Sequence, residues 1–242
     1  MADTLNIIEH PSPNFSTRLE DGEAAPIDHL ILHYTGMTSG AEALERLCDP
    51  DAKVSSHYLV EEDGRIFRLV DEQERAWHAG VAYWRGSKQI NRRSIGIEIV
   101  NPGHEHGYRA FPDVQINAVV KLCQDILNRH PIPTQNILGH SDVAPWRKED
   151  PGELFPWAAL AVSGIGQWPN EPGETLDANT AKAALSNIGY LMDEPSDLTS
   201  TVIAFQRRYR PKLLNGQLDD ETCRLIAAVA QTLDIDVSAN PG

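Results

Sequence analysis

The sequence has few cysteines and fewer basic than acidic side chains, and each shortage excludes a class of protein. Its 242 residues include three cysteines, scattered along the chain. An odd, dispersed set does not suit a disulfide-stabilised secreted domain, so we expect reduced thiols. Lysine and arginine number 21 against 35 aspartates and glutamates, a net charge of −14. Nucleic acids and anionic membranes attract basic surfaces, so neither is an expected partner.

Long runs of apolar residues are also absent. A membrane-spanning helix needs about 20 of them in succession, and no segment approaches that length. The first residues, MADTLNIIEHPSPNF, have no basic start, apolar stretch or small-residue cleavage site of a secretory signal peptide. The sequence therefore predicts a cytoplasmic protein. A periplasmic protein whose export signal is atypical or has been removed stays open as the alternative.

The hydrophobic pattern alternates between strands and helices over the first two thirds of the chain. Short apolar runs predict strands at 29–35, 57–70, 94–101 and 136–140, the second of them a hairpin that turns at Asp63-Gly64. Helical spacing predicts helices at 38–49 and 111–128. Residues 1–26 are expected to be an extended lead-in. Such alternation is typical of an α/β domain, here a central mixed β-sheet flanked by helices.

A segment rich in glycine and proline, residues 163–174, interrupts this pattern. We place a linker there and predict two domains, 1–165 and 175–242. The second domain contains three short helical patterns, with Asn215-Gly216 as the turn between the last two. A three-helix domain of this size lies near the lower limit for an independent core.

Three possible metal ligands lie at the ends of predicted strands. His33 is near the end of one strand, His140 closes another, and Asp150 lies in the loop that follows. Catalytic zinc takes three protein ligands of such types and keeps a fourth position for water. The sequence contains neither HExxH nor a CxxC pair. By themselves these residues are weak evidence for a metal site, and they favour two hydrogen-bonded histidines at sheet ends with an aspartate that opens a turn before Pro151-Gly152.

Two further residues are candidates for catalysis. Glu98 interrupts an otherwise apolar strand, on the face opposite Ile97 and Ile99. A carboxylate at such a position is paired, exposed on a half-covered sheet, or active in a cleft. Lys148 precedes Asp150 by two residues, so an extended stretch would direct both side chains to the same side.

Five blocks of sequence are more specific together than any one motif: LILHYTG (30–36), SSHYLVEEDGRI (55–66), RAWHAGVAYW (75–84), NRRSIGIEIVN (91–101) and LGHSDVAPWRKEDPGELFPW (138–157). Taken together and in order, they resemble the N-acetylmuramoyl-L-alanine amidases of the AmpD/AmiD type. The resemblance implies a mixed sheet with zinc in a surface groove. It also implies hydrolysis of the amide bond between N-acetylmuramic acid, including its 1,6-anhydro form, and L-alanine.

The same resemblance implies a role for each candidate residue. His33, His140 and Asp150 match the zinc ligands, and a zinc-bound water is the implied nucleophile. Glu98 matches the general base and acid, and Lys148 matches the lysine that stabilises the oxyanion. A loop beside the groove, residues 77–79, also matches, but no chemistry is assigned to its Trp, His and Ala.

The C-terminal part resembles the three-helix peptidoglycan-binding module, through IAFQRRYRP (203–211) and NGQLDDETCRLI (215–226). Peptidoglycan or its fragments are therefore the expected partners. A helical appendage that only packs against the first domain is the alternative. Two other functions also stay open: a peptidoglycan-recognition module without catalysis, and a lytic amidase of the phage type.

Overall fold

A computed structural model describes residues 5–235 of the chain. Internal contacts divide the chain into two compact units. We call Met1–Gly80 with Gln89–Gly139 the sheet unit, and Val81–Lys88 with His140–Gly242 the helical unit. The division into two domains at 1–165 and 175–242 is a statement about separate folding, which these units do not test, so it stays a prediction.

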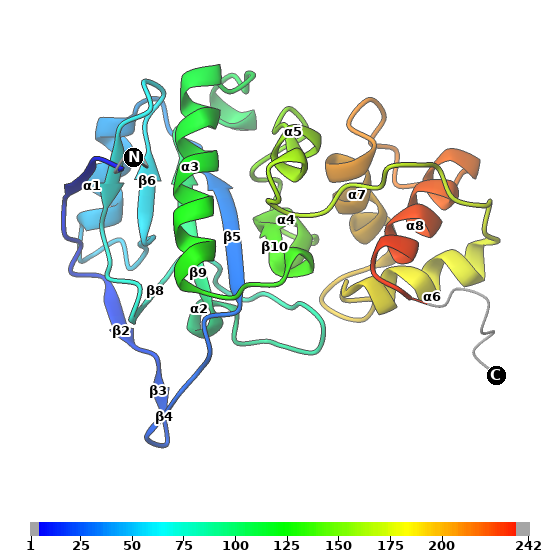
Figure 1. Ribbon diagram of the computed structural model, residues 1–242, viewed down its shortest axis with the longest axis horizontal. Helices are drawn as coiled ribbons and strands as arrows, with labels where there is room; N and C mark the ends of the chain where they lie inside the picture. Colours follow the sequence, from blue (N-terminus) through cyan, green and yellow to red (C-terminus); the bar gives the residue numbers. More distant parts are fainter. Residues whose placement is uncertain (1–4, 236–242) are drawn as a thin grey trace. The chain divides into compact units, whose positions relative to one another are not determined.

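The centre of the sheet unit is a six-stranded sheet in the order β1-β7-β6-β9-β5-β10 (Figure 1). Its strands are β1 (Ile7–Glu9), β5 (His29–Tyr34), β6 (Tyr58–Val60), β7 (Ile66–Arg68), β9 (Ser94–Ile99) and β10 (Ile137–Gly139). Strands β6, β9, β5 and β10 are parallel, whereas β7 is antiparallel to β6. The predicted mixed sheet is confirmed. Parallel strands are covered on both faces, which explains the continuous apolar run in β5.

The predicted hairpin joins β6 to β7, and Gly64 at its turn has a φ of 86° that suits glycine. Within the predicted lead-in, however, the structure contains strands. Strand β1 pairs with β7 at the sheet edge, and a small sheet joins β2 (Phe15–Thr17) to β8 (Glu74–Ala76). A short hairpin of β3 (Leu19–Glu20) and β4 (Glu23–Ala24) extends from this region in Figure 1. These strands of two or three residues lie outside any longer apolar run of the kind that predicted β6, β7 and β10, so no pattern in the sequence indicates them.

Helices flank the sheet as predicted. They are α1 (Gly40–Cys48), α2 (Ile90–Arg93) and α3 (Asp113–Arg129), with short 3-10 turns η1 (His104–His106) and η2 (Thr134–Asn136). The Ser39 side chain caps α1 by accepting from the backbone N–H of Glu42. Helix α3 lies in front of the sheet in Figure 1. Its buried Gln115 donates to the carbonyls of Val60 and Val100, which ties the start of the helix to the ends of β6 and β9.

The helical unit contains α4 (His140–Val143), α5 (Trp157–Val162), α6 (Ala178–Ile188), α7 (Leu198–Tyr209) and α8 (Asp220–Thr232). The last three are the predicted C-terminal helices. A buried ion pair links α7 to α4, because Arg208 donates to Asp142 over 2.8 Å. The Tyr190 hydroxyl also donates to Asp142, and the Arg208 guanidinium lies 4.0 Å from the centre of the Trp157 ring. The C-terminal helices therefore share one core with the segment that follows β10.

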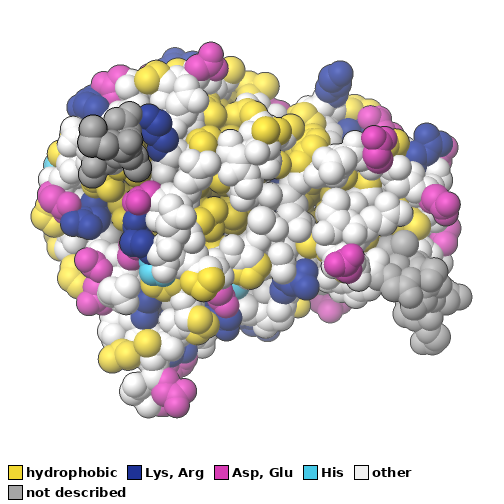
Figure 2. Space-filling model, in the orientation of Figure 1, with side chains coloured by type: hydrophobic (Ala, Val, Ile, Leu, Met, Phe, Trp, Pro, Cys, Tyr) yellow, Lys and Arg dark blue, Asp and Glu magenta, His cyan; other side chains and the backbone are white. Residues whose placement is uncertain are grey.

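The cysteines, the helices and the surface can be compared with the expectations drawn from composition. All three cysteines are unpaired, and Cys123 and Cys223 are buried in helices. Within residues 5–235 every helix is too short or too polar to cross a bilayer. Figure 2 shows acidic and basic side chains interspersed on the face in view.

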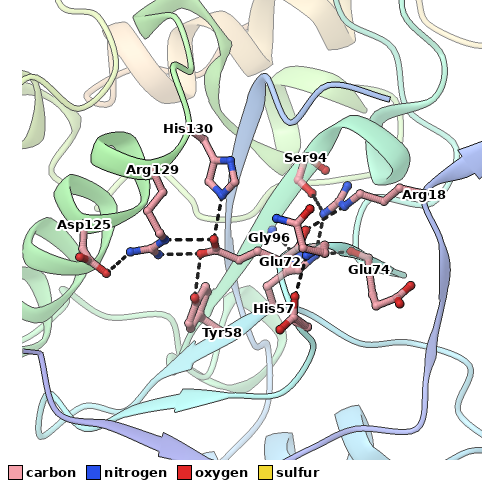
Figure 3. A network of polar contacts seen from close by, with 12 residues as sticks. Arg18, His57, Tyr58, Glu72, Glu74, Ser94, Gly96, Asp125, Arg129 and His130 are labelled. Carbon is pink, nitrogen blue, oxygen red and sulfur yellow. Dashed lines mark hydrogen bonds and ion pairs between the residues drawn. The ribbon is translucent and has the colours of Figure 1, made fainter. Parts of the chain in front are cut away.

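A buried polar network surrounds Glu72 in the sheet unit (Figure 3). Its carboxylate accepts hydrogen bonds from Tyr58 at 2.7 Å, Arg129 at 2.7 Å and His130 at 2.8 Å. Burial alone would raise the pKa of Glu72, but hydrogen bonds from Arg129, His130 and Tyr58 lower it to about 2. The Glu72 carbonyl accepts from Arg18, whose guanidinium also donates to the carbonyl of Ser94.

We predict that Glu72→Gln lowers the free energy of unfolding by about 3 kcal/mol at pH 7. A carboxyl whose pKa is lowered by folding stabilises the protein above its ordinary value of 4.5 and loses this effect as the pH falls toward about 2. The difference between variant and wild type should therefore shrink across that range in urea denaturation. Asp125→Asn is the control, because it removes the other, half-exposed partner of Arg129 and should cost less than about 1 kcal/mol. Equal stability of Glu72→Gln and wild type at pH 7 would contradict the prediction.

Candidate metal centre

The predicted metal ligands lie at the carboxyl ends of parallel strands. His33 is the last residue but one of β5, and His140 directly follows Gly139, the last residue of β10. Gly139 pairs in register with Leu32, the residue before His33. Ligand sites of sheets with parallel strands form at this edge.

His33, His140 and Asp150 form a group that could hold a metal ion. All three are buried, and one ligand atom from each lies within 4.8 Å of the others. His140 Nδ1 is 3.0 Å from Asp150 Oδ2. The backbone N–H of Ser141 donates to the Asp150 carbonyl over 2.9 Å, which closes the 141–150 loop and returns Asp150 to His140. The structure thus brings the three predicted ligands together, while metal binding itself stays a prediction.

Glu98 lies next to His33 across the sheet. The two residues pair in register between β9 and β5, and paired residues of neighbouring strands direct their side chains to the same face. The Glu98 side chain is half-buried. A carboxylate therefore lies beside a possible metal ligand, as a general base would require, and its catalytic role stays a prediction.

Lys148 lies in the same loop as Asp150. Its backbone N–H donates to the Ala144 carbonyl over 3.0 Å, and its side chain is half-buried. The neighbouring Arg147 donates to the Val81 carbonyl, and its Nη2 lies 3.4 Å from His140 Nε2. The oxyanion role of Lys148 stays a prediction, and Arg147 is a second cation in this loop that the sequence did not single out.

His78 is the residue near the site to which the sequence assigned no chemistry. It follows β8, it is buried, and its Nδ1 lies 3.0 Å from His33 Nε2. A sequence signal for it exists in β9, where Gly96 interrupts the apolar run between Ser94 and Glu98. Glycine inside a strand often marks the close approach of another group.

Comparison with known proteins identifies the family. Residues 23–153, more than half of the chain, match the Amidase_2 family, described as N-acetylmuramoyl-L-alanine amidase. The chain belongs to this family. The predicted resemblance and the enzyme class, an amide hydrolase, are confirmed.

Relatives in this family match beyond the amidase segment. The N-acetylmuramoyl-L-alanine amidase AmiD of Escherichia coli (strain K12) is 37% identical, over 93% of this chain and 90% of AmiD. A 1,6-anhydro-N-acetylmuramyl-L-alanine amidase AmpD of Enterobacter cloacae is 33% identical, over 61% of this chain and 84% of AmpD. The solved structure of Escherichia coli AmiD, in complex with anhydro-N-acetylmuramic acid-L-Ala-D-gamma-Glu-L-Lys, superposes with a TM-score of 0.78 and 34% identity. It covers 92% of this chain and 99% of the AmiD chain, so the similarity includes the C-terminal helices.

We predict that His33→Asn abolishes stoichiometric binding of a divalent transition metal. The affinity of the protein for the metal should fall more than about 100-fold, since changing a residue that only orients a ligand already lowers metal affinity about 10- to 100-fold. Equilibrium dialysis followed by elemental analysis measures this. His29→Asn is the matched control, because His29 lies on the same strand but pairs with Asp28. Unchanged metal content in His33→Asn would remove His33 from the ligand set.

Proposed function

We propose that the chain hydrolyses the amide bond between N-acetylmuramic acid and L-alanine in peptidoglycan fragments, with zinc as its metal. The observation that carries this proposal is the buried group of His33, His140 and Asp150, with Glu98 in register beside His33. Two imidazoles and one carboxylate suit catalytic zinc, which uses three protein ligands. AmiD holds an anhydro-muropeptide as its substrate, which supports the same substrate class here.

The residues of the chain then have separate roles. When bound, zinc supplies Lewis-acid polarisation of a carbonyl and lowers the pKa of water toward about 7. Glu98 accepts a proton from the attacking water and returns one to the departing amine of L-alanine. The Lys148 ammonium compensates the negative charge that develops on the carbonyl oxygen.

Soluble muropeptides that carry the 1,6-anhydro sugar are the substrates that we favour over intact murein. AmpD relatives are named for the anhydro form, and AmiD was solved with such a fragment. The three unpaired cysteines are compatible with the reducing cytoplasm as the compartment. Fractionation of cells that express the tagged chain tests the compartment, and recovery from the periplasm would contradict it.

The reaction itself is tested on two substrates in parallel. Zinc-loaded protein is incubated with anhydro-muropeptides and, separately, with intact sacculi, and the products are analysed by mass spectrometry. We expect free peptides that begin with L-alanine, formed faster from the soluble fragments. Cleavage at another bond would overturn the amidase proposal. Binding without cleavage would favour a recognition module, and faster release from sacculi would favour a lytic enzyme.

We predict that Glu98→Gln keeps its zinc but loses about 10²- to 10⁴-fold in kcat, the usual contribution of acid–base catalysis. The amide retains the size of the side chain but cannot accept the proton of water. Metal content and turnover are measured on the same preparation, with Glu105→Gln as a control at an exposed carboxylate. Turnover at the wild-type rate would exclude Glu98 as the general base.

A further inference from the structure

His78 lies between the possible metal ligand His33 and strand β9. The residue is 8% exposed, and each ring nitrogen contacts a polar group. Its Nδ1 lies 3.0 Å from His33 Nε2, and its Nε2 lies 3.0 Å from Ser94 Oγ. All of these residues belong to the sheet unit. His33 and His78 are also in edge contact, with ring centres 5.1 Å apart.

The direction of these hydrogen bonds follows from Ser94. The Ser94 hydroxyl donates its single hydrogen to the Ile90 carbonyl over 2.6 Å, so toward His78 it acts as an acceptor. His78 Nε2 therefore carries a hydrogen. A neutral imidazole has one N–H, so His78 Nδ1 is an acceptor and His33 Nε2 must donate to it. The nitrogen of His33 with a lone pair for a metal is then Nδ1.

The chain holds His78 in place through two further features. The backbone N–H groups of His78 and Ala79 donate to Asn91 Oδ1, over 3.2 Å and 2.7 Å. A Cβ atom at Gly96 would lie 2.5 to 2.7 Å from three atoms of the His78 ring, so only glycine leaves room for the ring at this point of β9. Independent contacts from α2 and β9 therefore place the ring against His33.

We propose that His78 is a positioning residue that holds His33 as its Nε2–H tautomer and so presents Nδ1 to the metal. The proposal rests on the proposed function, because it requires that His33 binds metal. A hydrogen bond to the second nitrogen of a metal-bound histidine fixes its tautomer and ring orientation and increases its basicity. Among residues 5–235 the group of possible ligands comprises His33, His140 and Asp150, so His78 acts through His33.

Two substitutions at residue 78 separate the hydrogen bond from packing. His78→Phe keeps a planar ring against Gly96 but removes the acceptor, and zinc affinity should fall about 10- to 100-fold. His78→Asn provides Oδ1 close to the former position of Nδ1, and it should recover most of the lost affinity. Zinc dissociation constants are measured by competition with a chelator, and thermal unfolding of the metal-free variants reports whether they fold. His29→Asn changes a residue on β5, the strand of His33, that takes no part in the hydrogen bonds between His33, His78 and Ser94. This variant should bind zinc like the wild type.

Nuclear magnetic resonance of ¹⁵N-labelled histidines tests the same arrangement without any substitution. In the metal-free wild type we expect Nε2–H tautomers for both His33 and His78. A His33 that carries its hydrogen on Nδ1 would overturn the proposal, whether or not the variants fold.

The outcomes separate this proposal from the proposed function. Zinc binding by the wild type together with equal affinity in His78→Phe would overturn the positioning role alone. Weak binding by both His78→Phe and His78→Asn, with wild-type thermal stability, would overturn the acceptor role of residue 78. A wild type that binds no zinc would overturn the proposed function and the positioning role together.

Discussion

The parallel pairing of β9, β5 and β10 is the constraint on which the candidate site depends. It places Glu98 beside His33 and leads the chain directly from Gly139 into His140. A shift of one residue in the β5–β9 register would direct His33 and Glu98 to opposite faces of the sheet. The apolar residues of β5 and β9 that are buried on both faces prevent such a shift, because it would place Glu98 in the apolar interior. The strand register that packs the sheet therefore also determines the positions of His33 and Glu98.

Burying a polar side chain near the sheet lowers the stability of the fold unless that side chain has a hydrogen-bond partner. His57 has such a partner, because its Nδ1 accepts from the backbone N–H of Gly96. Burial, and after it in size the charge of Arg18, lowers the pKa of His57 to about 3. His57 is thus a neutral structural residue at physiological pH. The His78 ring lies beside that of His57, with ring centres 5.8 Å apart, but His78 contacts the possible metal ligand His33. The two neighbouring rings therefore differ in their partners, since His57 accepts from a backbone N–H whereas His78 contacts the side chain of His33.

The helical unit also contains a buried charge, the carboxylate of Asp142. Asp142 lies two residues after His140 and accepts from both Arg208 and Tyr190. Removing one partner of a buried ion pair commonly costs about 3–5 kcal/mol, because the other charge stays buried without compensation, so the buried Asp142 requires Arg208 of α7. Similarity to AmiD over 92% of the chain agrees with a C-terminal region that is part of the shared fold. Whether these helices also bind glycan is a separate property of their surface.

Local patterns in the sequence determined the longer elements and the family. Apolar runs, helical spacing and the Asp63-Gly64 turn predicted β5, β9, β10, α1, α3 and the β6–β7 hairpin, because those signals depend on neighbours along the chain. The ligand set came from the family resemblance, since the spacing of His33, His140 and Asp150 by itself favours ordinary residues at a sheet end. Only the tertiary structure decided the edge strand β1, the union of α6–α8 with α4, and the contact of His78 with His33. These depend on contacts between residues 45 or more positions apart in several cases, and such contacts leave no periodic trace in the sequence.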